Sequence, residues 1–271
     1  MQVRKEYKYL VEISKIEALR KALAPFVELD KYAAKNDKQE YKVRSIYFDT
    51  GKMNYYHEKD AGVKIRKKFR IRGYEQVDRD SIIFLEVKRK NNEIVSKNRA
   101  PVYFKNLHEL LETRQSEQLV TPLSSFPKAV YDADVFLYYL YRQYLVPVIL
   151  IVYDREPFVS KFNSNLRITF DKNIRSKVTT DINGLSSEHK NIFALSQYFV
   201  LEIKFDFGYP IWLKQIIKEF GLVRQAVSKY CICVDKHIDE IGMLFRHPSI
   251  EFFNNSISNE QVINEVLTEN G

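Results

Sequence analysis

Apolar and polar residues alternate along much of the chain. Adjacent residues of a strand point to opposite faces, so this alternation predicts strands that bury one face. Eight runs show the pattern, at residues 3–11, 41–49, 62–73, 82–90, 94–104, 147–156, 165–172 and 198–206. Helical periodicity is found at residues 14–25, 106–115, 130–143, 210–220 and 229–243. Strands arranged as hairpins with helices between them predict an antiparallel α+β fold.

One face of the strand at residues 62–73 is a row of cations of a single sign. The row consists of Lys64, Arg66, Lys68, Arg70 and Arg72. Neighbouring members of this row are two residues apart on the strand. Two unit charges at that separation repel by about 2.4 kcal/mol at an effective dielectric constant near 20. Nearby acids, water or a bound polyanion must relieve this repulsion.

Four other strands also separate charged from apolar positions, for example Glu202 and Lys204 from Leu201 and Ile203. If the apolar faces met inside a barrel, the helices at 14–25, 130–143 and 229–243 would have little to cover. We therefore expect a closed eight-stranded antiparallel β-barrel with a charged lumen and with helices packed outside. Such a lumen is wide enough for one small ligand.

Composition limits the function further. The 271 residues include 45% hydrophobic residues and carry a net charge of +8, which predicts a globular chain with an anionic partner. We expect one domain at residues 1–250 and a tail at 251–271. The N-terminus does not resemble a signal peptide, and the apolar stretch at 144–153 is too short to cross a bilayer. These features predict a cytoplasmic protein without a transmembrane segment.

Several motifs together resemble the VTC domain, a polyphosphate polymerase domain of the triphosphate tunnel metalloenzyme group, which also includes the CYTH phosphatases. The resemblance covers roughly residues 3–240. Its motifs are "EYKY" at 6–9, "RSIYFDT" at 44–50, "FRIRGY" at 69–74, "FLEVKRK" at 84–90, "YDREPF" at 153–158, "LRITFD" at 166–171, "LEIKFD" at 201–206 and "SKY" at 228–230. The chain departs from the CYTH pattern of two glutamates before a lysine, because Arg4 stands at the first glutamate position.

The resemblance implies a tunnel that binds a triphosphate chain with basic side chains and a divalent metal, Mn²⁺ or Mg²⁺. The implied phosphate ligands are Lys8, Arg70, Arg72, Lys88, Lys97, Arg155, Arg167 and Lys229. Glu202 is the implied metal ligand, and the implied catalytic set is Arg70, Arg72, Lys88 and Glu202. Asp171 and Glu86 are candidates for additional metal partners, but we expect them to form salt bridges instead. Glu6 is either a metal ligand or the counter-ion of Lys8. Tyr47, Tyr74 and Tyr230 are expected to pack.

The implied reaction is transfer of the γ-phosphoryl group of ATP to a growing inorganic polyphosphate chain. Neither a Walker loop nor a dinucleotide fingerprint occurs in the sequence, so side chains would have to hold the nucleotide. A tripolyphosphatase or nucleoside triphosphatase on the same fold, or a non-catalytic binder of polyphosphate or RNA, remain alternatives. We expect no specific nucleic acid partner, because the aromatic residues alternate with the charges and so lie on the packed face. The sequence leaves the oligomeric state open.

Overall fold

A computed structural model describes residues 4–91, 94–162, 165–206 and 208–246. The chain forms two compact units, Met1–His237 and Ile238–Gly271. In the second unit the described residues form one helix, α8 (Ile238–Arg246). The predicted tail at 251–271 lies outside the described residues, and the domain boundary at residue 250 stays a prediction.

The first unit is built on one antiparallel sheet, and each predicted strand is present in it. Its long strands are β1 (Lys5–Glu12), β3 (Tyr41–Asp49), β4 (Ile65–Tyr74), β5 (Ile82–Asn91), β6 (Ile94–Tyr103), β7 (Val146–Ser160), β8 (Arg167–Val178) and β10 (Tyr198–Phe205). Their order in the sheet is β1-β10-β8-β7-β3-β4-β5-β6. Two short strands that the sequence did not predict, β2 (Val27–Leu29) and β9 (Ile192–Phe193), pair with β7 and β8. Lys64 precedes β4 and is exposed, so the cationic row begins at Arg66.

Helices of the first unit lie near the predicted positions, with two additions, at residues 54–60 and 116–119. They are α1 (Ile16–Leu23), α2 (Asn54–Asp60), α3 (Leu107–Thr113), α4 (Ser116–Leu119), α5 (Ala129–Arg142), α6 (Ile211–Glu219) and α7 (Lys229–Lys236). The sequence analysis missed α2, which depends on a tertiary contact. The buried carboxylate of Asp49 accepts hydrogen bonds from the backbone N–H groups of Tyr55 and Tyr56. The segment predicted as one helix at 229–243 is interrupted after Lys236.

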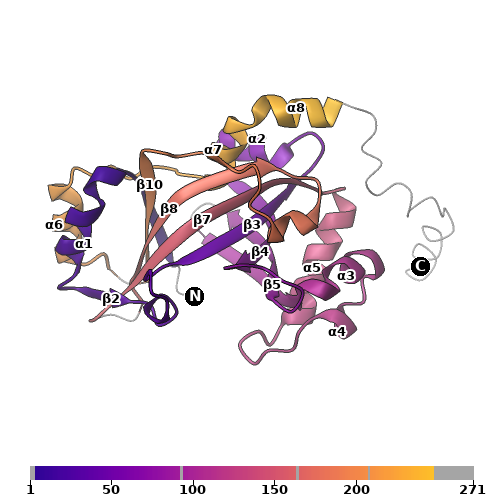
Figure 1. Cartoon of the computed structure of the whole chain (residues 1–271), viewed down its shortest axis with the longest axis horizontal. Coiled ribbons are helices and arrows are strands. Elements are labelled where there is room, and N and C mark those ends of the chain that lie inside the picture. The colour runs from indigo at the N-terminus through magenta and orange to yellow at the C-terminus, as the bar shows by residue number, and fades with distance from the viewer. Residues whose placement is uncertain (1–3, 92–93, 163–164, 207, 247–271) are drawn as a thin grey trace. The chain divides into compact units, whose positions relative to one another are not determined.

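The apolar strand faces are covered by helices, as predicted. One core cluster joins the outward residues of β3, β4, β5 and β6 to α3 and α5. A second cluster joins β1, β8 and β10 to α1 and α6. Figure 1 shows α1 and α6 together at one end of the sheet and α3, α4 and α5 together at the other. Lys67, which breaks the alternation of β4, also lies on this outer face, with its ammonium 4.7 Å from the ring centre of Tyr139.

The sheet is open, so the prediction of a closed barrel was wrong. Its first and last strands, β1 and β6, do not pair with each other. Other segments of the chain occupy part of each free edge instead. Gln225 donates its backbone N–H to the carbonyl of Lys8, and Thr121 donates its backbone N–H to the carbonyl of Pro101, both at 2.9 Å. These contacts satisfy edge groups that closure would otherwise pair.

Although open, the sheet curls strongly, and one ion pair demonstrates this. β1 and β5 are six strand spacings apart in the sheet order. In a flat sheet they would be separated by about 29 Å. Yet Lys88 Nζ of β5 lies 3.3 Å from Glu6 Oε2 of β1. The sheet is therefore a half-barrel, and its concave face is the charged one.

Candidate functional site

The concave face gathers charged side chains from strands that are distant in sequence. Its charged members include Glu6 and Lys8 of β1, Arg70 and Arg72 of β4, Glu86 and Lys88 of β5, Lys97 and Arg99 of β6, Arg155 of β7, Arg167 and Asp171 of β8, and Glu202 and Lys204 of β10. The structure therefore brings all the strand residues implied as phosphate or metal ligands onto one face. Lys229 joins them from the first turn of α7. We call Arg70, Arg72, Glu86, Arg155, Asp171, Glu202 and Lys229 the inner site.

Asp171 holds two cations of the inner site. It is fully buried and accepts two hydrogen bonds from the guanidinium of Arg155, at 2.6 and 2.8 Å. Its second oxygen also lies 2.5 Å from Lys229 Nζ. Burial alone would raise the pKa of Asp171, but Arg155 and Lys229 outweigh it and lower the pKa. Asp171 is thus an ionised salt-bridge partner, as expected.

Glu202 and Glu6 lie on neighbouring strands on either side of Lys8. Glu202 pairs with Lys204 and lies 3.8 Å from Lys8 and 4.0 Å from Lys229. Burial opposes ionisation of Glu202, yet Lys204, Lys8 and Lys229 hold its pKa well below the usual range. Glu6 lies 2.8 Å from Lys8 and 3.3 Å from Lys88. Burial and Glu202 would raise the pKa of Glu6, but these lysines lower it to about 2.

Glu86 collects three cations at the other side of the face. Arg70 and Lys97 lie 2.6 and 2.7 Å from its carboxylate, and Arg99 lies 3.1 Å away. Despite burial, these cations and Arg72 hold the pKa of Glu86 well below its usual range. For Lys97 burial outweighs the attraction of Glu86, and the pKa falls to about 7. The expected salt-bridge role of Glu86 is confirmed.

Arg72 is the member of the inner site with neutral partners. Only 6% of it is exposed, and it donates hydrogen bonds to the hydroxyls of Ser45 and Tyr153, at 3.1 and 3.3 Å. Within the described residues no carboxylate lies at ion-pair distance from its guanidinium. A buried charge without a counter-charge in direct contact is costly, and Glu86, which contacts Arg70, attracts Arg72 only from beyond ion-pair distance. This arrangement suits a site whose missing negative charge is supplied by a ligand.

Tyr47, Tyr74 and Tyr230 pack against other rings, as predicted. The hydroxyls of Tyr47 and Tyr74 also support cations of the face, which the sequence did not indicate. Arg70 donates to the hydroxyl of Tyr47 at 2.8 Å, and Arg99 donates to Tyr74 at 2.9 Å. Tyr230 stacks on Tyr47 and donates its hydroxyl to Asp49. These neutral hydroxyls position guanidinium groups without cancelling their charge.

Arg167 lies on the same face but in a different setting. It pairs with Asp30 at 3.3 Å and donates to the hydroxyl of Tyr41. About a third of its side chain is exposed, and its Nε is buried without a hydrogen-bond partner. Arg167 thus keeps one buried donor unsatisfied, while the exposed part of its guanidinium adds positive charge to the face.

The carboxylates suit a metal shared with a substrate better than a metal held by protein alone. Among the described residues, no three His, Cys, Asp or Glu side chains converge to hold an ion. Mg²⁺ is commonly bound by one or two carboxylates together with phosphate oxygens and water. Glu202 is in register with Thr169, whose buried hydroxyl lacks a hydrogen-bond partner. These oxygens fit a metal that phosphates help to coordinate.

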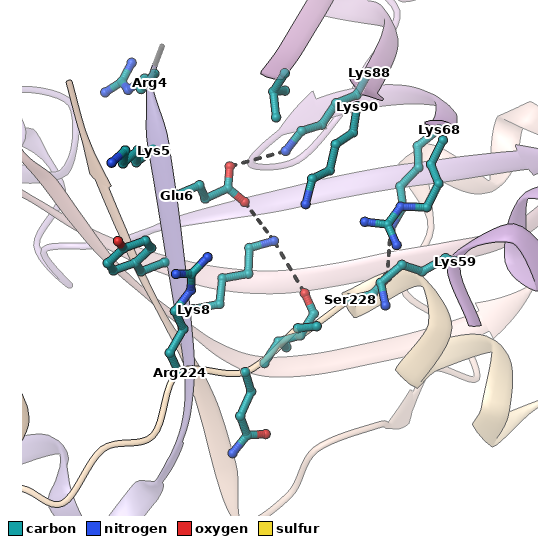
Figure 2. Close-up of a pocket in the computed structure, with 16 residues that line it drawn as sticks. Arg4, Lys5, Glu6, Lys8, Lys59, Lys68, Lys88, Lys90, Arg224 and Ser228 are labelled. Atoms are coloured by element: carbon teal, nitrogen blue, oxygen red, sulfur yellow. Dashed lines mark hydrogen bonds and ion pairs between the residues drawn. The ribbon is translucent and has the colours of Figure 1, made fainter. Parts of the chain in front are cut away.

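A pocket of about 400 Å³ adjoins the inner site (Figure 2). We call it the basic pocket; it is lined by Arg4, Lys5, Glu6, Tyr7, Lys8, Lys59, Arg66, Lys68, Lys88, Lys90, Val95, Arg224, Gln225, Ala226, Val227 and Ser228. Nine of these residues are basic and Glu6 alone is acidic. Of the implied phosphate ligands, Lys8 and Lys88 line it, whereas the others lie elsewhere on the face.

Most of the basic pocket was not assigned from the sequence, although part of the signal was visible. Arg66 and Lys68 stand in the cationic row, and Lys90 shares the parity of Glu86 and Lys88. Lys59 of α2 and Arg224 of the segment before α7 are brought in by tertiary folding alone. No sequence pattern indicated them.

One comparison with known proteins, the family model, supports the resemblance. The family model for the VTC domain matches residues 3–238. A search of curated proteins found no match. Similar solved structures include a putative adenylate cyclase from Bacillus halodurans, at 14% identity and TM-score 0.47, covering 84% of this chain and 94% of that chain. Another is a putative adenylyl cyclase from Hippeastrum, described as having a dominant triphosphatase activity, at 14% identity and TM-score 0.46, covering 87% and 96%.

None of the described helices is both long and apolar enough to cross a bilayer.

Proposed function

Because the chain belongs to the VTC domain family, we propose that it is a metal-dependent polyphosphate polymerase. It transfers the γ-phosphoryl group of ATP to the end of an inorganic polyphosphate chain bound on the concave face. The observation that supports this most is Arg72, a buried cation with neutral partners in the middle of a cationic face. A phosphate chain supplies the negative charge that the protein does not.

Phosphoryl transfer depends on positioning and charge neutralisation more than on a protein nucleophile. In this proposal Arg70, Arg72 and Arg155 bind phosphate oxygens with paired N–H donors, a geometry that suits guanidinium groups. Lys8, Lys88 and Lys229 act as point charges. Lys97 and Arg167 extend the cationic surface on either side.

Carboxylates of the concave face also hold the cations in position before substrate binds. Asp171 holds Arg155 bidentately, and Glu86 holds Arg70. Preorganised charges lose less free energy to reorganisation during the reaction. When bound, Mn²⁺ or Mg²⁺ neutralises phosphate charge as a Lewis acid, and Glu202 is the carboxylate proposed to hold it.

A triphosphatase acting on tripolyphosphate or nucleoside triphosphates is the second candidate. The open sheet favours it, because β1 and β6 do not close a barrel that would exclude water. Hydrolysis requires only that a water molecule take the place of the attacking phosphate. The inner site would serve both reactions.

One incubation separates these reactions. The protein is mixed with ATP and Mn²⁺ or Mg²⁺, and the products are resolved on a gel and assayed for free phosphate. Long chains indicate a polymerase, and free phosphate alone indicates a triphosphatase. Binding without either product would leave a non-catalytic binder and would contradict the proposal.

The variant E202Q tests the metal ligand. We expect it to lose turnover while still binding tripolyphosphate in EDTA, because the cations of the face remain. E28Q, which changes an exposed glutamate of β2, is the matched control and should retain activity. Full activity of E202Q would remove Glu202 from the mechanism.

A further inference from the structure

The basic pocket differs from the inner site in its charge balance. Within the described residues, no carboxylate lies within ion-pair distance of Lys59, Arg66, Lys68, Lys90 or Arg224. In the inner site Arg70, Arg155 and Lys229 each contact a carboxylate. Partly buried cations that face one another without counter-charges repel. The basic pocket therefore has an excess of positive charge that a bound anion would neutralise.

Lys68 is the most constrained cation of the pocket. Its ammonium donates a 2.7 Å hydrogen bond to the hydroxyl of Ser228, which also caps the N-terminus of α7. The ring centre of Tyr230 lies 5.7 Å away. Burial lowers the pKa of Lys68 to about 7, and the charges of Lys8, Lys88 and Lys59 act in the same direction. An anion in the pocket would reverse this effect.

The basic pocket and the inner site are continuous. Lys8 and Lys88 line the pocket, and Lys8 also lies 3.8 Å from Glu202 of the inner site. Figure 2 shows the carboxylate of Glu6 between these two lysines. Glu6 occupies the place where negative charge is needed at the junction. A chain of phosphates that leaves the inner site thus meets the pocket next.

We propose that the basic pocket is a second phosphate subsite, which holds the phosphates of an inorganic polyphosphate chain beyond those bound in the inner site. This inference rests on the proposed function and specifies its substrate as a chain longer than triphosphate. Lys59, Lys68 and Lys90 are its distinguishing ligands, because they line the pocket and lie outside the inner site.

A nucleoside or a nucleic acid base fits the pocket poorly. Single-stranded nucleic acids rely on aromatic rings on which bases stack. Of the described residues that line the pocket, Tyr7 alone is aromatic. The guanidinium of Arg224 already lies over its ring, 4.0 Å from the ring centre. The pocket therefore offers charge without a stacking surface, which suits an inorganic chain.

The test compares two ligand lengths in a triple variant, K59Q/K68Q/K90Q. Binding of inorganic triphosphate and of a much longer inorganic polyphosphate is measured by calorimetry in EDTA at several salt concentrations. K67Q, which removes the neighbouring charge on the outer face, is the matched control, and a thermal melt checks folding of each protein. The variant R72M shows how binding of each ligand changes when the inner site loses one cation.

We expect the triple variant to bind triphosphate within about twofold of the wild type and to bind the long chain at least tenfold more weakly. Its plot of log affinity against log salt concentration should become less steep, by roughly 0.7 for each removed lysine that contacts the chain in the wild type. K67Q should match the wild type with both ligands. R72M should weaken both ligands.

Equal long-chain affinity in the triple variant and the wild type would overturn the inference, as would an equal loss of both ligand lengths in a folded variant. Single-stranded RNA that competes as well as polyphosphate of equal charge would assign the pocket to nucleic acid instead. Length-dependent binding without polymer synthesis would uphold the subsite and reject the polymerase. If the triple variant synthesised polymer and bound both ligands as the wild type does, the polymerase would be upheld and the subsite rejected.

Discussion

The inner site and the basic pocket use similar residues in different ways. In the inner site, buried carboxylates hold most cations in place; Asp171, for example, contacts both Arg155 and Lys229. In the basic pocket, Glu6 is the single acid among nine basic residues. The inner site is therefore preorganised, with fixed guanidinium groups that can orient phosphate oxygens. The pocket supplies positive charge that carboxylates do not fix in place, which suits attraction of a chain more than orientation of a reacting group.

This difference separates catalysis from chain binding. A paired cation costs less to bury than an unpaired one but offers only part of its charge to a ligand. An unpaired cation remains available, at the cost of repulsion from its neighbours. Arg72 is the exception in the inner site, since its partners are neutral hydroxyls. It combines fixed geometry with an uncancelled charge, which makes it the most informative residue to change.

The largest effect on catalysis is expected for R72M. Loss of this buried charge should lower kcat/KM for ATP by about 10²–10³-fold, comparable to removal of one preorganised donor. Steady-state assays of ATP consumption measure it, and K68Q serves for comparison. If K68Q reduced ATP turnover as strongly as R72M, the proposed division between the inner site and the basic pocket would fail.

Stability should reveal the paired cations of the inner site. D171N leaves Arg155 and Lys229 buried without their carboxylate, which should cost about 3–5 kcal/mol in the free energy of unfolding. Urea unfolding measures this, and tripolyphosphate should restore part of the loss by supplying the missing charge. D134N on the exposed face of α5 should change stability by no more than about 0.5 kcal/mol. An unchanged D171N would show that ion pairing does not organise the inner site.

The pH dependence of binding should sharpen the contrast. Lys68, with its pKa lowered to about 7, takes up a proton when a polyanion binds. Affinity for long polyphosphate should therefore fall as pH rises above 7, by roughly tenfold up to pH 8.5. The groups that face Lys68 are Lys8, Lys59, Arg66, Lys88, Ser228, Tyr230 and Cys231.

Two variants isolate this proton. K68R stays charged throughout, so it should retain affinity but lose the part of the pH dependence that Lys68 contributes; Lys97, whose pKa is also lowered to about 7, keeps its part. K68Q should bind the long chain more weakly and lose the same part of the pH dependence. Calorimetry in two buffers of different ionisation enthalpy counts the protons taken up. A pH profile of K68R identical to that of the wild type would assign the proton to another group.

The smallest effect is expected for Y47F. It removes the hydroxyl that accepts a hydrogen bond from Arg70 at 2.8 Å, a contribution of about 1 kcal/mol. Turnover should fall about three- to tenfold, whereas Y138F on the exposed face of α5 should behave like the wild type. If Y47F kept full activity, Tyr47 would be a packing residue, as the sequence suggested.

Sequence analysis anticipated the strands and the charged face because alternation is a local property. Arg70 and Arg72 had to share a face with each other once the strand was recognised. Lys59 and Arg224 could not be predicted from the sequence, because α2 and the segment before α7 meet β4 and β1 only in the folded chain. Helix α2 was missed for a similar reason, because Asp49 caps it from the preceding strand.

The residues alone determined which side chains are charged, which strand face each one takes, and membership of the VTC domain family. Tertiary structure decided that the sheet curls without closing, which cations pair with Asp171, Glu86 and Glu202, and which stay unpaired beside Lys68. The reason is one of distance. Side-chain parity depends on adjacent residues, whereas charge compensation depends on groups far apart in the chain that meet only when strands six positions apart face each other.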